Sequence, residues 1–252
     1  MFAEERHELI NSILNEEGSI KVTELSEQLK VSEATIRRDL QEMEEKKLLR
    51  RTHGGAIKME NNNFEPAFVD KENTNHEDKV KIAKYAAKLI NDGDTIILDS
   101  GTTTLEIARN LTAKNVTVIT NSIDIAAELT NKEDIELIVT GGILRTSTRA
   151  MVGSIAVNIF EKFKVNKLFL GANGISVEDG ITTPNYTEAL TKTSMISSAK
   201  KIFIVADSSK FENTCFSKIC DIDKVTSIIT SGEVYEDIIE KLKIAGVKVV
   251  VV

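Results

Sequence analysis

From about residue 75 to its end, this chain of 252 residues alternates short apolar runs with helix-forming segments. Strands that alternate with helices in this way form a parallel sheet with helices on both faces, so we predict an α/β domain with a Rossmann-like sheet. The helical patterns cover residues 79–90, 103–112, 122–130, 153–163, 187–200 and 233–245. The apolar runs are TIILD (95–99), VTVIT (116–120), IELIVT (135–140), KLFLGA (167–172), KIFIVA (201–206), VTSIIT (225–230) and VKVVVV (247–252).

Residues 1–58 predict three short helices instead of that alternation. An apolar stripe at helical spacing predicts the first helix over residues 4–16. Thr23 is placed to cap a second helix that runs to about Lys30, and Ser32 is placed to cap a third. Two helices joined by a brief turn form a helix-turn-helix. The buried face of the third helix is expected to consist of Ile36, Leu40 and Met43.

A β-hairpin is predicted after the third helix by the segment LLRRTHGGAI. Gly54 and Gly55 are expected to form its turn, because glycine adopts positive φ without steric cost. A hairpin in this place is a wing, so residues 1–58 are predicted to form a winged helix-turn-helix DNA-binding domain. The polar stretch that follows contains three consecutive Asn and predicts a linker over residues 59–74. Residues 75–252 then form the α/β domain.

Basic side chains gather in the wing and third helix, although the net charge of the chain is −7. Residues 37–58 carry seven Lys and Arg against four Asp and Glu. The second helix of a helix-turn-helix enters the major groove, where arginine binds guanine with two hydrogen bonds, while hydroxyls and wing residues suit phosphates. The alternative is that these arginines only pair with Asp39, Glu42 or Glu45 on a solvated helix face. The residues expected to contact DNA are Ser32, Thr35, Arg37, Arg38, Arg50, Arg51, His53 and Gly54.

Small polar residues follow the predicted strands at their carboxyl ends, where open parallel sheets bind ligands. The loop 100–104 offers backbone N–H groups, hydroxyls and a helix N-terminus to a phosphate, although a simple helix cap would also use one of these hydroxyls. Gly141 and Gly142 allow a close backbone approach. The residues expected to bind this ligand are Asp99, Ser100, Gly101, Thr102, Thr103, Thr104, Asn121, Ser122, Gly141, Gly142, Asn173, Gly174, Lys192, Asp207 and Lys210.

Two interpretations stay open for several of these side chains. Asp99 is either a buried structural carboxylate or an acceptor for a ligand hydroxyl. Lys192 is either a ligand contact or the partner of Glu188 on a helix surface. Lys210 is either a ligand contact or an ordinary turn lysine. The loop residues Arg145 and Arg149 are placed either to close over a phosphate or to lie in a mobile surface loop. 

Seven motifs distributed through both parts of the chain carry a family resemblance. They are ERHELI (5–10), SEATIRRDLQEMEEKKLLRRTHGGAI (32–57), LDSGTTT (98–104), VITNS (118–122), TGG (140–142), FLGANGIS (169–176) and ADSSKF (206–211). Together they resemble the DeoR family of bacterial transcriptional regulators, nearly from end to end. The resemblance implies a winged helix-turn-helix followed by an effector domain similar in fold to ribose-5-phosphate isomerase.

The resemblance also implies a biological role. Family members are typically oligomeric repressors of sugar-utilisation operons that phosphorylated sugars release. Lys192 and Lys210 match basic positions of the family's motifs, which favours them as ligand contacts. The stretches FEPAF and TRAMVGS look most like fructose-operon members, which implies fructose 1-phosphate as the effector.

A sugar-phosphate isomerase or deaminase with an accessory DNA-binding domain is the alternative function. Isomerisation needs a general base, normally a carboxylate. The related isomerases, as the resemblance implies, carry acidic residues in the loop that reads GANG here, and Asn173 cannot remove a proton from carbon. Asp99, Asp179 and Asp207 stay as candidate bases, so the sequence disfavours an enzyme. An architectural DNA-binding protein, the third class, would have little use for a ligand site.

The composition bears on the remaining classes. The terminal run VVVV, like every other apolar run of the sequence, is far shorter than the roughly 20 residues of a membrane-spanning helix. The acidic N-terminus does not resemble a signal peptide, so we expect a cytoplasmic protein with no membrane partner. Cys215 and Cys220 lack the second pair of ligands of a zinc site, and we expect no metal or cofactor. The expected partners are double-stranded operator DNA, a phosphorylated sugar and further copies of this chain in a dimer or tetramer.

Overall fold

The computed structural model describes residues 3–45, 48–58 and 68–252. The chain divides into an N-terminal unit, Met1–Pro66, and a C-terminal unit, Ala67–Val252. Each unit has its own hydrophobic core. Within the described residues, no helix is both long and apolar enough to cross a bilayer.

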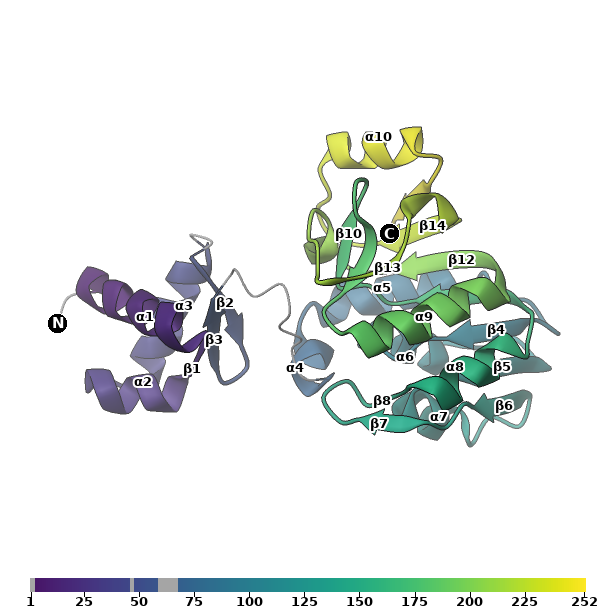
Figure 1. Ribbon diagram of the computed structural model, residues 1–252, viewed down its shortest axis with the longest axis horizontal. Helices are drawn as coiled ribbons and strands as arrows, with labels where there is room; N and C mark the ends of the chain where they lie inside the picture. Colours follow the sequence, from purple (N-terminus) through teal and green to yellow (C-terminus); the bar gives the residue numbers. More distant parts are fainter. Residues whose placement is uncertain (1–2, 46–47, 59–67) are drawn as a thin grey trace. The chain divides into compact units, whose positions relative to one another are not determined.

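The N-terminal unit consists of three helices and a small antiparallel sheet (Figure 1). Leu25 of the second helix packs into one core with Ile36, Leu40 and Met43 of the third, which confirms the buried face predicted for that helix. The sheet has the strand order β1-β3-β2, and β2 and β3 form the predicted wing. The elements are α1 (Ala3–Glu17), β1 (Ser19–Lys21), α2 (Val22–Leu29), α3 (Glu33–Glu45), β2 (Leu49–Thr52) and β3 (Gly55–Lys58).

Two local predictions in this unit are wrong. Helix α2 begins one residue before Thr23, and its N-cap residue is Lys21, which pairs with Glu24. In the hairpin Thr52 pairs with Gly55, so the two-residue turn is His53–Gly54, and neither Gly54 nor Gly55 has positive φ. Gly55 is required for space instead, because a Cβ there would lie 1.8 Å from the backbone oxygen of Ile20.

The C-terminal unit is built on a seven-stranded sheet with the order β15-β14-β12-β9-β4-β5-β6. All six strand pairs are parallel, which confirms the predicted α/β class. The strands are β4 (Thr95–Leu98), β5 (Val116–Thr120), β6 (Ile135–Val139), β9 (Val165–Leu170), β12 (Ala199–Val205), β14 (Ser227–Thr230) and β15 (Lys248–Val251).

Helices cover both faces of this sheet (Figure 1). Side chains of β4 alternate between two cores. Ile96 and Leu98 pack against three helices on one face of the sheet, and Ile97 packs against three helices on the other face. This period of two is the reason why a short apolar run forms a strand buried on both faces. The helices on the face of Ile96 and Leu98 are α5 (His76–Ala87), α6 (Thr102–Arg109) and α7 (Ile123–Leu129). The helices on the face of Ile97 are α8 (Ser154–Glu161), α9 (Tyr186–Ser198) and α10 (Glu236–Ile244).

Several elements of this unit were not predicted. A two-stranded hairpin follows β6, and a three-stranded antiparallel sheet with the order β10-β11-β13 stands apart from the main sheet. Two short 3-10 helices, η1 and η2, follow β12 and β13. These elements are β7 (Ile143–Arg145), β8 (Ala150–Val152), β10 (Gly174–Ser176), β11 (Gly180–Thr183), β13 (Ser217–Cys220), η1 (Ser208–Lys210) and η2 (Ile222–Lys224).

The linker predicted over residues 59–74 is wrong in its second half. Residues 59–67 lie outside the described part of the chain, but α4 (Phe68–Asn73) is a helix. Phe68 is buried in the core beneath α5 and α6, and burial of this aromatic ring explains why the segment is folded.

Candidate functional site

The third helix of the N-terminal unit begins at two hydroxyl groups. Ser32 Oγ accepts a hydrogen bond from the backbone N–H of Thr35 at 3.2 Å, which confirms the predicted cap. The two hydroxyl oxygens lie 2.9 Å apart, and Ser32 is exposed. Both side chains therefore lie at a helix N-terminus, where backbone N–H groups favour a phosphate.

Arg37 and Arg38 project from the exposed side of α3. Arg37 Nη2 lies 3.2 Å from Glu33 Oε2, and its Nη1 donates to the backbone oxygen of His53 at 3.3 Å. Arg38 Nε lies 3.3 Å from Glu42 Oε1, a pairing that we predicted as the alternative to DNA contact. Exposed i,i+4 pairs contribute about 0.3–0.5 kcal/mol, so a phosphate or base displaces them at little cost.

The wing adds the remaining residues expected to contact DNA. Arg50 is exposed and Arg51 is half-buried on β2, and His53 and Gly54 form the exposed turn. The backbone N–H of Arg51 donates to Glu44 Oε1 on α3 at 2.9 Å, while Arg37 bonds the turn itself. These two contacts join the wing to α3, so all eight predicted residues lie on α3, its cap or the attached wing.

Asp39 has a structural role that the sequence reasoning missed. It is buried, and it accepts hydrogen bonds from Arg6 Nε and Nη2 at 2.6 and 2.8 Å. The sequence predicts Asp39 as a surface partner of the arginines, whereas the structure shows that it joins α1 to α3. Its spacing from Ile36, three residues along the helix, put it on the buried face and could have revealed this.

In the C-terminal unit, the predicted ligand residues other than Lys192, which lies on α9, follow five adjacent parallel strands, β12, β9, β4, β5 and β6. Their carboxyl ends lie at one edge of the sheet, so the loops are neighbours. The backbone N–H of Ser100 donates to Asn121 Oδ1 at 3.0 Å, and Asn121 Nδ2 donates to the backbone oxygen of Met151. Ser122 Oγ caps α7 by accepting from the backbone N–H of Ile125 at 3.3 Å.

The loop 100–104 leads into α6. The N-cap residue is Gly101, which has no side chain to cap the helix, so simple capping does not account for the hydroxyl groups of this loop. Thr104 Oγ1 donates to the backbone oxygen of Gly101 at 2.9 Å and is fully buried. Thr102 and Thr103 retain 8% of their surface each.

Asp99 and Lys192 form a buried ion pair at the centre of this edge. Asp99 Oδ2 accepts hydrogen bonds from Lys192 Nζ and, at 3.1 Å, from the backbone N–H of Gly171. Burial raises the pKa of Asp99 above its usual value, although Lys192 opposes the shift. Asp99 Oδ1 is buried and accepts no hydrogen bond from the described part of the chain. Lys192 is 5% exposed, so its interpretation as one half of a surface pair is wrong.

The sequence predicts Glu188 only as the surface partner of Lys192, whereas in the structure Glu188 is buried one turn before Lys192 on α9. Its Oε1 accepts hydrogen bonds from Arg145 Nη1 at 2.9 Å and from Thr148 Oγ1. Arg149 instead points to Asp124, with Nη1 and Oδ1 2.9 Å apart. Arg145 pairs with Glu188 and Arg149 pairs with Asp124, so neither arginine is simply solvated.

Three other predicted ligand residues, Gly142, Gly174 and Asn173, have structural contacts of their own, whereas Gly141 has open space around it. A Cβ on Gly142 would lie 2.7 Å from the backbone oxygen of Val152, and one on Gly174 would lie 2.3 Å from that of Asn213. Gly141 has positive φ, and a Cβ there would meet nothing within 4 Å. Asn173 Oδ1 accepts a hydrogen bond from Thr183 Oγ1 at 3.1 Å. The close approaches at Gly142 and Gly174 are therefore to this chain's own backbone.

Asp207 and Lys210 lie in the loop after β12. Asp207 accepts hydrogen bonds from the backbone N–H of Ser209 at 3.1 Å and from Asn75 Nδ2 at 3.0 Å, and Lys210 Nζ lies 4.0 Å from its Oδ2. Burial alone would raise the pKa of Asp207, but the charge of Lys210 and the hydrogen bonds from Ser209 and Asn75 outweigh it, so the pKa lies below its usual value. Asp207 is therefore a carboxylate that its neighbours hold in the ionised form, with its hydrogen bonds accepted by Oδ1.

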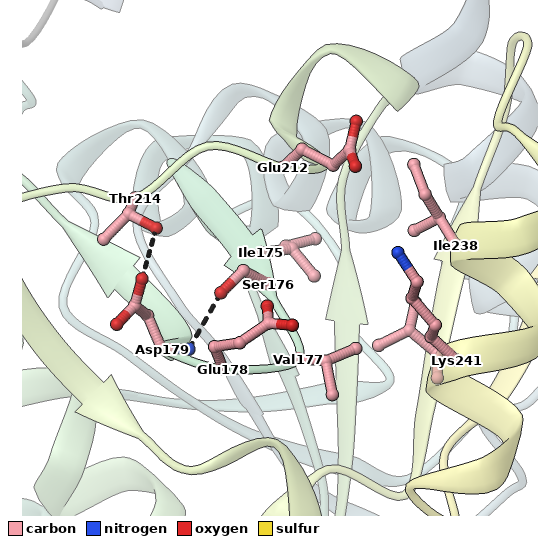
Figure 2. A pocket seen from close by; sticks show the side chains of 10 residues that line it. Ile175, Ser176, Val177, Glu178, Asp179, Glu212, Thr214, Ile238 and Lys241 are labelled. Carbon is pink, nitrogen blue, oxygen red and sulfur yellow. Dashed lines mark hydrogen bonds between the residues drawn. The ribbon is translucent and has the colours of Figure 1, made fainter.

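A cavity of about 310 Å³ lies elsewhere, between the β10–β11 hairpin and α10. Its floor is apolar, and Figure 2 shows Lys241 across it from the carboxylates of Glu178 and Glu212. Asp179 on its rim accepts a hydrogen bond from Thr214 Oγ1 at 2.7 Å. None of the fifteen predicted ligand residues lines this cavity, so the strand-end loops and the cavity are separate features.

Comparison with known proteins identifies both units. Residues 6–62 match the model of a DeoR-like helix-turn-helix domain, and residues 74–232 match that of a DeoR C terminal sensor domain. The HTH-type transcriptional regulator YulB of Bacillus subtilis, named as uncharacterised, is 40% identical over 252 residues, which cover 100% of this chain and 98% of that protein. The lactose phosphotransferase system repressor of Streptococcus mutans is 35% identical over 247 residues, covering 96% and 97%. A ribose 5-phosphate isomerase from Methanocaldococcus jannaschii matches with a TM-score of 0.41 and 20% identity over 56% of each chain.

Proposed function

We propose, from the premise that this chain belongs to the DeoR family of transcriptional regulators, that it represses a sugar-utilisation operon under the control of a phosphorylated sugar. The observation that carries the proposal is the presence of two polar sites in separate units of one chain. One site is the exposed basic surface of α3 and the wing. The other is the set of loops at the carboxyl edge of the parallel sheet.

The phosphate group of the effector binds to loop 100–104 and Lys210. Loop 100–104 supplies backbone N–H groups at the start of α6, and a helix N-terminus favours an anion. Lys210 contributes an ammonium group close to the exposed Ser209. This assignment is supported by the glycine N-cap, which leaves the N-terminus of α6 without a side-chain cap.

The sugar hydroxyls bind to Asp99. Its Oδ2 is held by Lys192 and Gly171, whereas Oδ1 is a buried carboxylate oxygen that accepts no hydrogen bond from the described residues. A buried acceptor without a donor costs about 1–3 kcal/mol, and a ligand hydroxyl would relieve that cost. Fructose 1-phosphate, which offers both a phosphate and several hydroxyls, is the first compound to test.

Repression requires two copies of the N-terminal unit on one operator. A helix-turn-helix protein that pairs through another domain binds two half-sites about one helical turn apart. We place the pairing surface on the C-terminal unit, in a dimer or tetramer. A sugar phosphate that prefers one arrangement of the assembly then changes its affinity for DNA.

A thermal-shift screen tests the effector assignment. The full chain is heated with fructose 1-phosphate, fructose 1,6-bisphosphate, glucose 6-phosphate and ribose 5-phosphate, and with the unphosphorylated sugars. A ligand that binds the folded state at 100 times its Kd stabilises it by about 2.7 kcal/mol, which raises the melting temperature. Lys210→Ala should abolish the shift. Lys224→Ala, which removes the corresponding exposed lysine of η2, should retain it.

Operator binding completes the test. Full-length protein selects its own site from random-sequence DNA, and its affinity is measured with and without the compound that stabilises it. The proposal predicts weaker binding in the presence of that compound. If no phosphorylated sugar shifts either the melting temperature or the DNA affinity, the sensing function is wrong.

The enzyme alternative has less support. The two relatives reported above from Bacillus subtilis and Streptococcus mutans are named as a transcriptional regulator and a repressor. Asp99 is bonded to Lys192, and Asp207 is bonded to Asn75 and Ser209. Asp179 lies on the rim of the separate cavity. A turnover assay with ribose 5-phosphate and fructose 6-phosphate would overturn our conclusion if it showed isomerisation that Asp99→Asn abolishes.

A further inference from the structure

The segment Phe68–Lys79, here called the junction segment, is the first described part of the chain after the N-terminal unit. It contains α4, two connecting residues and the first turn of α5. All of its contacts considered below lie within the C-terminal unit. They reach the turn between β7 and β8, the far end of α6, and the loops that follow β12 and β14.

The first contact is with the turn between β7 and β8. The backbone N–H of Phe68 donates to the backbone oxygen of Ser147 at 2.8 Å. The guanidinium carbon of Arg149 lies 5.2 Å from the centre of the Phe68 ring, the geometry of a cation–π contact. The start of the junction segment is thus held by the hairpin that follows Gly141 and Gly142.

The second contact is with α6, the helix that begins at loop 100–104. Glu72 Oε1 lies 3.4 Å from Arg109 Nη2, and Arg109 also pairs with Glu106 on its own helix. The junction segment therefore contacts the far end of the helix whose N-terminus faces the proposed phosphate position.

The third contact is with the loop that contains Asp207 and Lys210. Asn75 Nδ2 donates to Asp207 Oδ1 at 3.0 Å, across 132 positions of sequence. Asn75 has a φ of +51°, a conformation that few residues other than Asn and Gly adopt readily. One turn further, Asp78 Oδ1 accepts a hydrogen bond from Ser231 Oγ at 2.9 Å, so this part of the segment is fixed on both β12 and β14 loops.

Asp207 is shared between the junction segment and the proposed ligand loop. One oxygen of this carboxylate, Oδ1, accepts hydrogen bonds from both Asn75 and Ser209, and the ammonium group of Lys210 lies near the other oxygen, Oδ2. An anion that draws Lys210 and the Ser209 hydroxyl toward itself removes positive charge and one donor from Asp207. The hydrogen bond from Asn75 must then carry more of the stabilisation of that carboxylate, and its length and strength change.

We propose that the Asn75–Asp207 hydrogen bond couples the anion-binding loop 207–210 to the junction segment, and thereby to the N-terminal unit. The identity of the anion, a sugar phosphate, rests on the proposed function. Asn75 is a positioning residue in this scheme, since it acts through Asp207 and not on the ligand. By linkage, DNA and effector alter each other's affinity by the same factor, and removal of Asn75 reduces that factor.

Asn75→Gly isolates the carboxamide, because glycine adopts the same positive φ without strain. Asn115→Gly is the matched control: Asn115 also has positive φ, at +54°, but it precedes β5 at the opposite edge of the sheet. The readout is the ratio of operator Kd with and without the sugar phosphate that stabilises the wild-type chain. We expect this ratio to fall about tenfold toward 1 in Asn75→Gly, the factor set by one hydrogen bond to a charged group, and to stay at the wild-type value in Asn115→Gly.

A second measurement decides the proposal without any ligand. Amide hydrogen exchange of residues 68–79 is compared in wild-type protein, Lys210→Ala and Lys224→Ala. Lys210→Ala should slow exchange in the junction segment, because Asp207 without its nearby cation is a stronger acceptor for Asn75, whereas Lys224→Ala should not change it. Unchanged exchange in Lys210→Ala, or an unchanged Kd ratio in Asn75→Gly, would overturn the coupling. If no sugar phosphate binds, the proposed effector is wrong, and the exchange comparison alone decides the coupling.

Discussion

The N-terminal unit presents its candidate functional side chains to solvent, whereas the C-terminal unit buries many of its own. Arg38 is 83% exposed and Arg37 is held only by surface contacts. Asp99, Lys192 and Asp207 are each at most 5% exposed and bonded to other parts of the chain. DNA is a long polymer that binds to an exposed, preformed surface of a protein, whereas a small ligand is enclosed by the protein. Substitutions of the exposed arginines in the first unit should therefore change affinity alone, while those of the buried residues in the second should also change stability.

The largest effect is expected from Lys192→Met, which leaves the Asp99 carboxylate buried without its counter-charge. Breaking a buried ion pair in this way costs about 3–5 kcal/mol. The measurement is urea unfolding of the full chain, fitted with one transition for each unit. The double variant Asp99→Asn/Lys192→Met removes both charges and should recover most of the loss. A single variant as stable as the wild type would remove the contrast between the units.

A pH-dependent gain in stability is expected from Lys79, whose Nζ is buried and donates to the backbone oxygen of Lys71. Burial lowers the pKa of Lys79 from 10.5 to about 8. Between these values the unfolded chain keeps the proton and the folded chain does not, so the free energy of unfolding rises with pH, by about 3 kcal/mol in total.

The measurement is the free energy of unfolding from pH 7 to pH 11. Lys79→Met should lack the rise, and the difference between the two profiles cancels the titration of the other lysines and tyrosines. Parallel profiles would show that the side chain is not desolvated as the structure indicates.

Arg37→Ala should weaken operator binding by about 1–3 kcal/mol if the side chain reads a base. The free energy of unfolding should change by less than about 0.5 kcal/mol, because the contacts that it loses are on the surface. Arg38→Ala serves as the neighbouring control. Equal losses on operator and unrelated DNA would assign Arg37 to a phosphate, and a large loss of stability would contradict its exposed role.

The smallest effect is expected at Ser32. Ser32→Ala removes the cap of α3 and should destabilise the N-terminal unit by about 1 kcal/mol. Ser32→Asp keeps a capping oxygen but places a negative charge at the DNA surface, so it should retain stability and weaken DNA binding. If Ser32→Asp bound DNA as well as the wild type, Ser32 would have only the structural role.

Periodic burial made the main sheet and the six flanking helices predictable from sequence. Ile96, Ile97 and Leu98 alternate between two cores, and such a pattern is local. The strands β7, β8, β10, β11 and β13, of three or four residues each, lie outside the alternation of strands and helices that reveals an equally short strand such as β4. The pairing of β11 with β13 also depends on distant partners, such as Thr183 and Ser217.

The candidate sites were predictable as residue types but not as contacts. Asp99 and Lys192 lie 93 positions apart, so no local pattern could show that one neutralises the other. The same holds for Arg145 and Glu188, which are 43 positions apart. Gly55 and Gly142 were expected to serve a turn and a ligand, yet each is required by a backbone oxygen that passes close to it. Such close approaches arise from tertiary packing.

Isothermal titration of the stabilising sugar phosphate into the full chain, alone and then saturated with operator DNA, tests the account most directly. If the loops of the C-terminal unit control the DNA surface, operator DNA must weaken sugar-phosphate binding by the same factor by which the sugar phosphate weakens DNA binding. Identical sugar-phosphate affinity in the presence and absence of operator DNA would contradict the account.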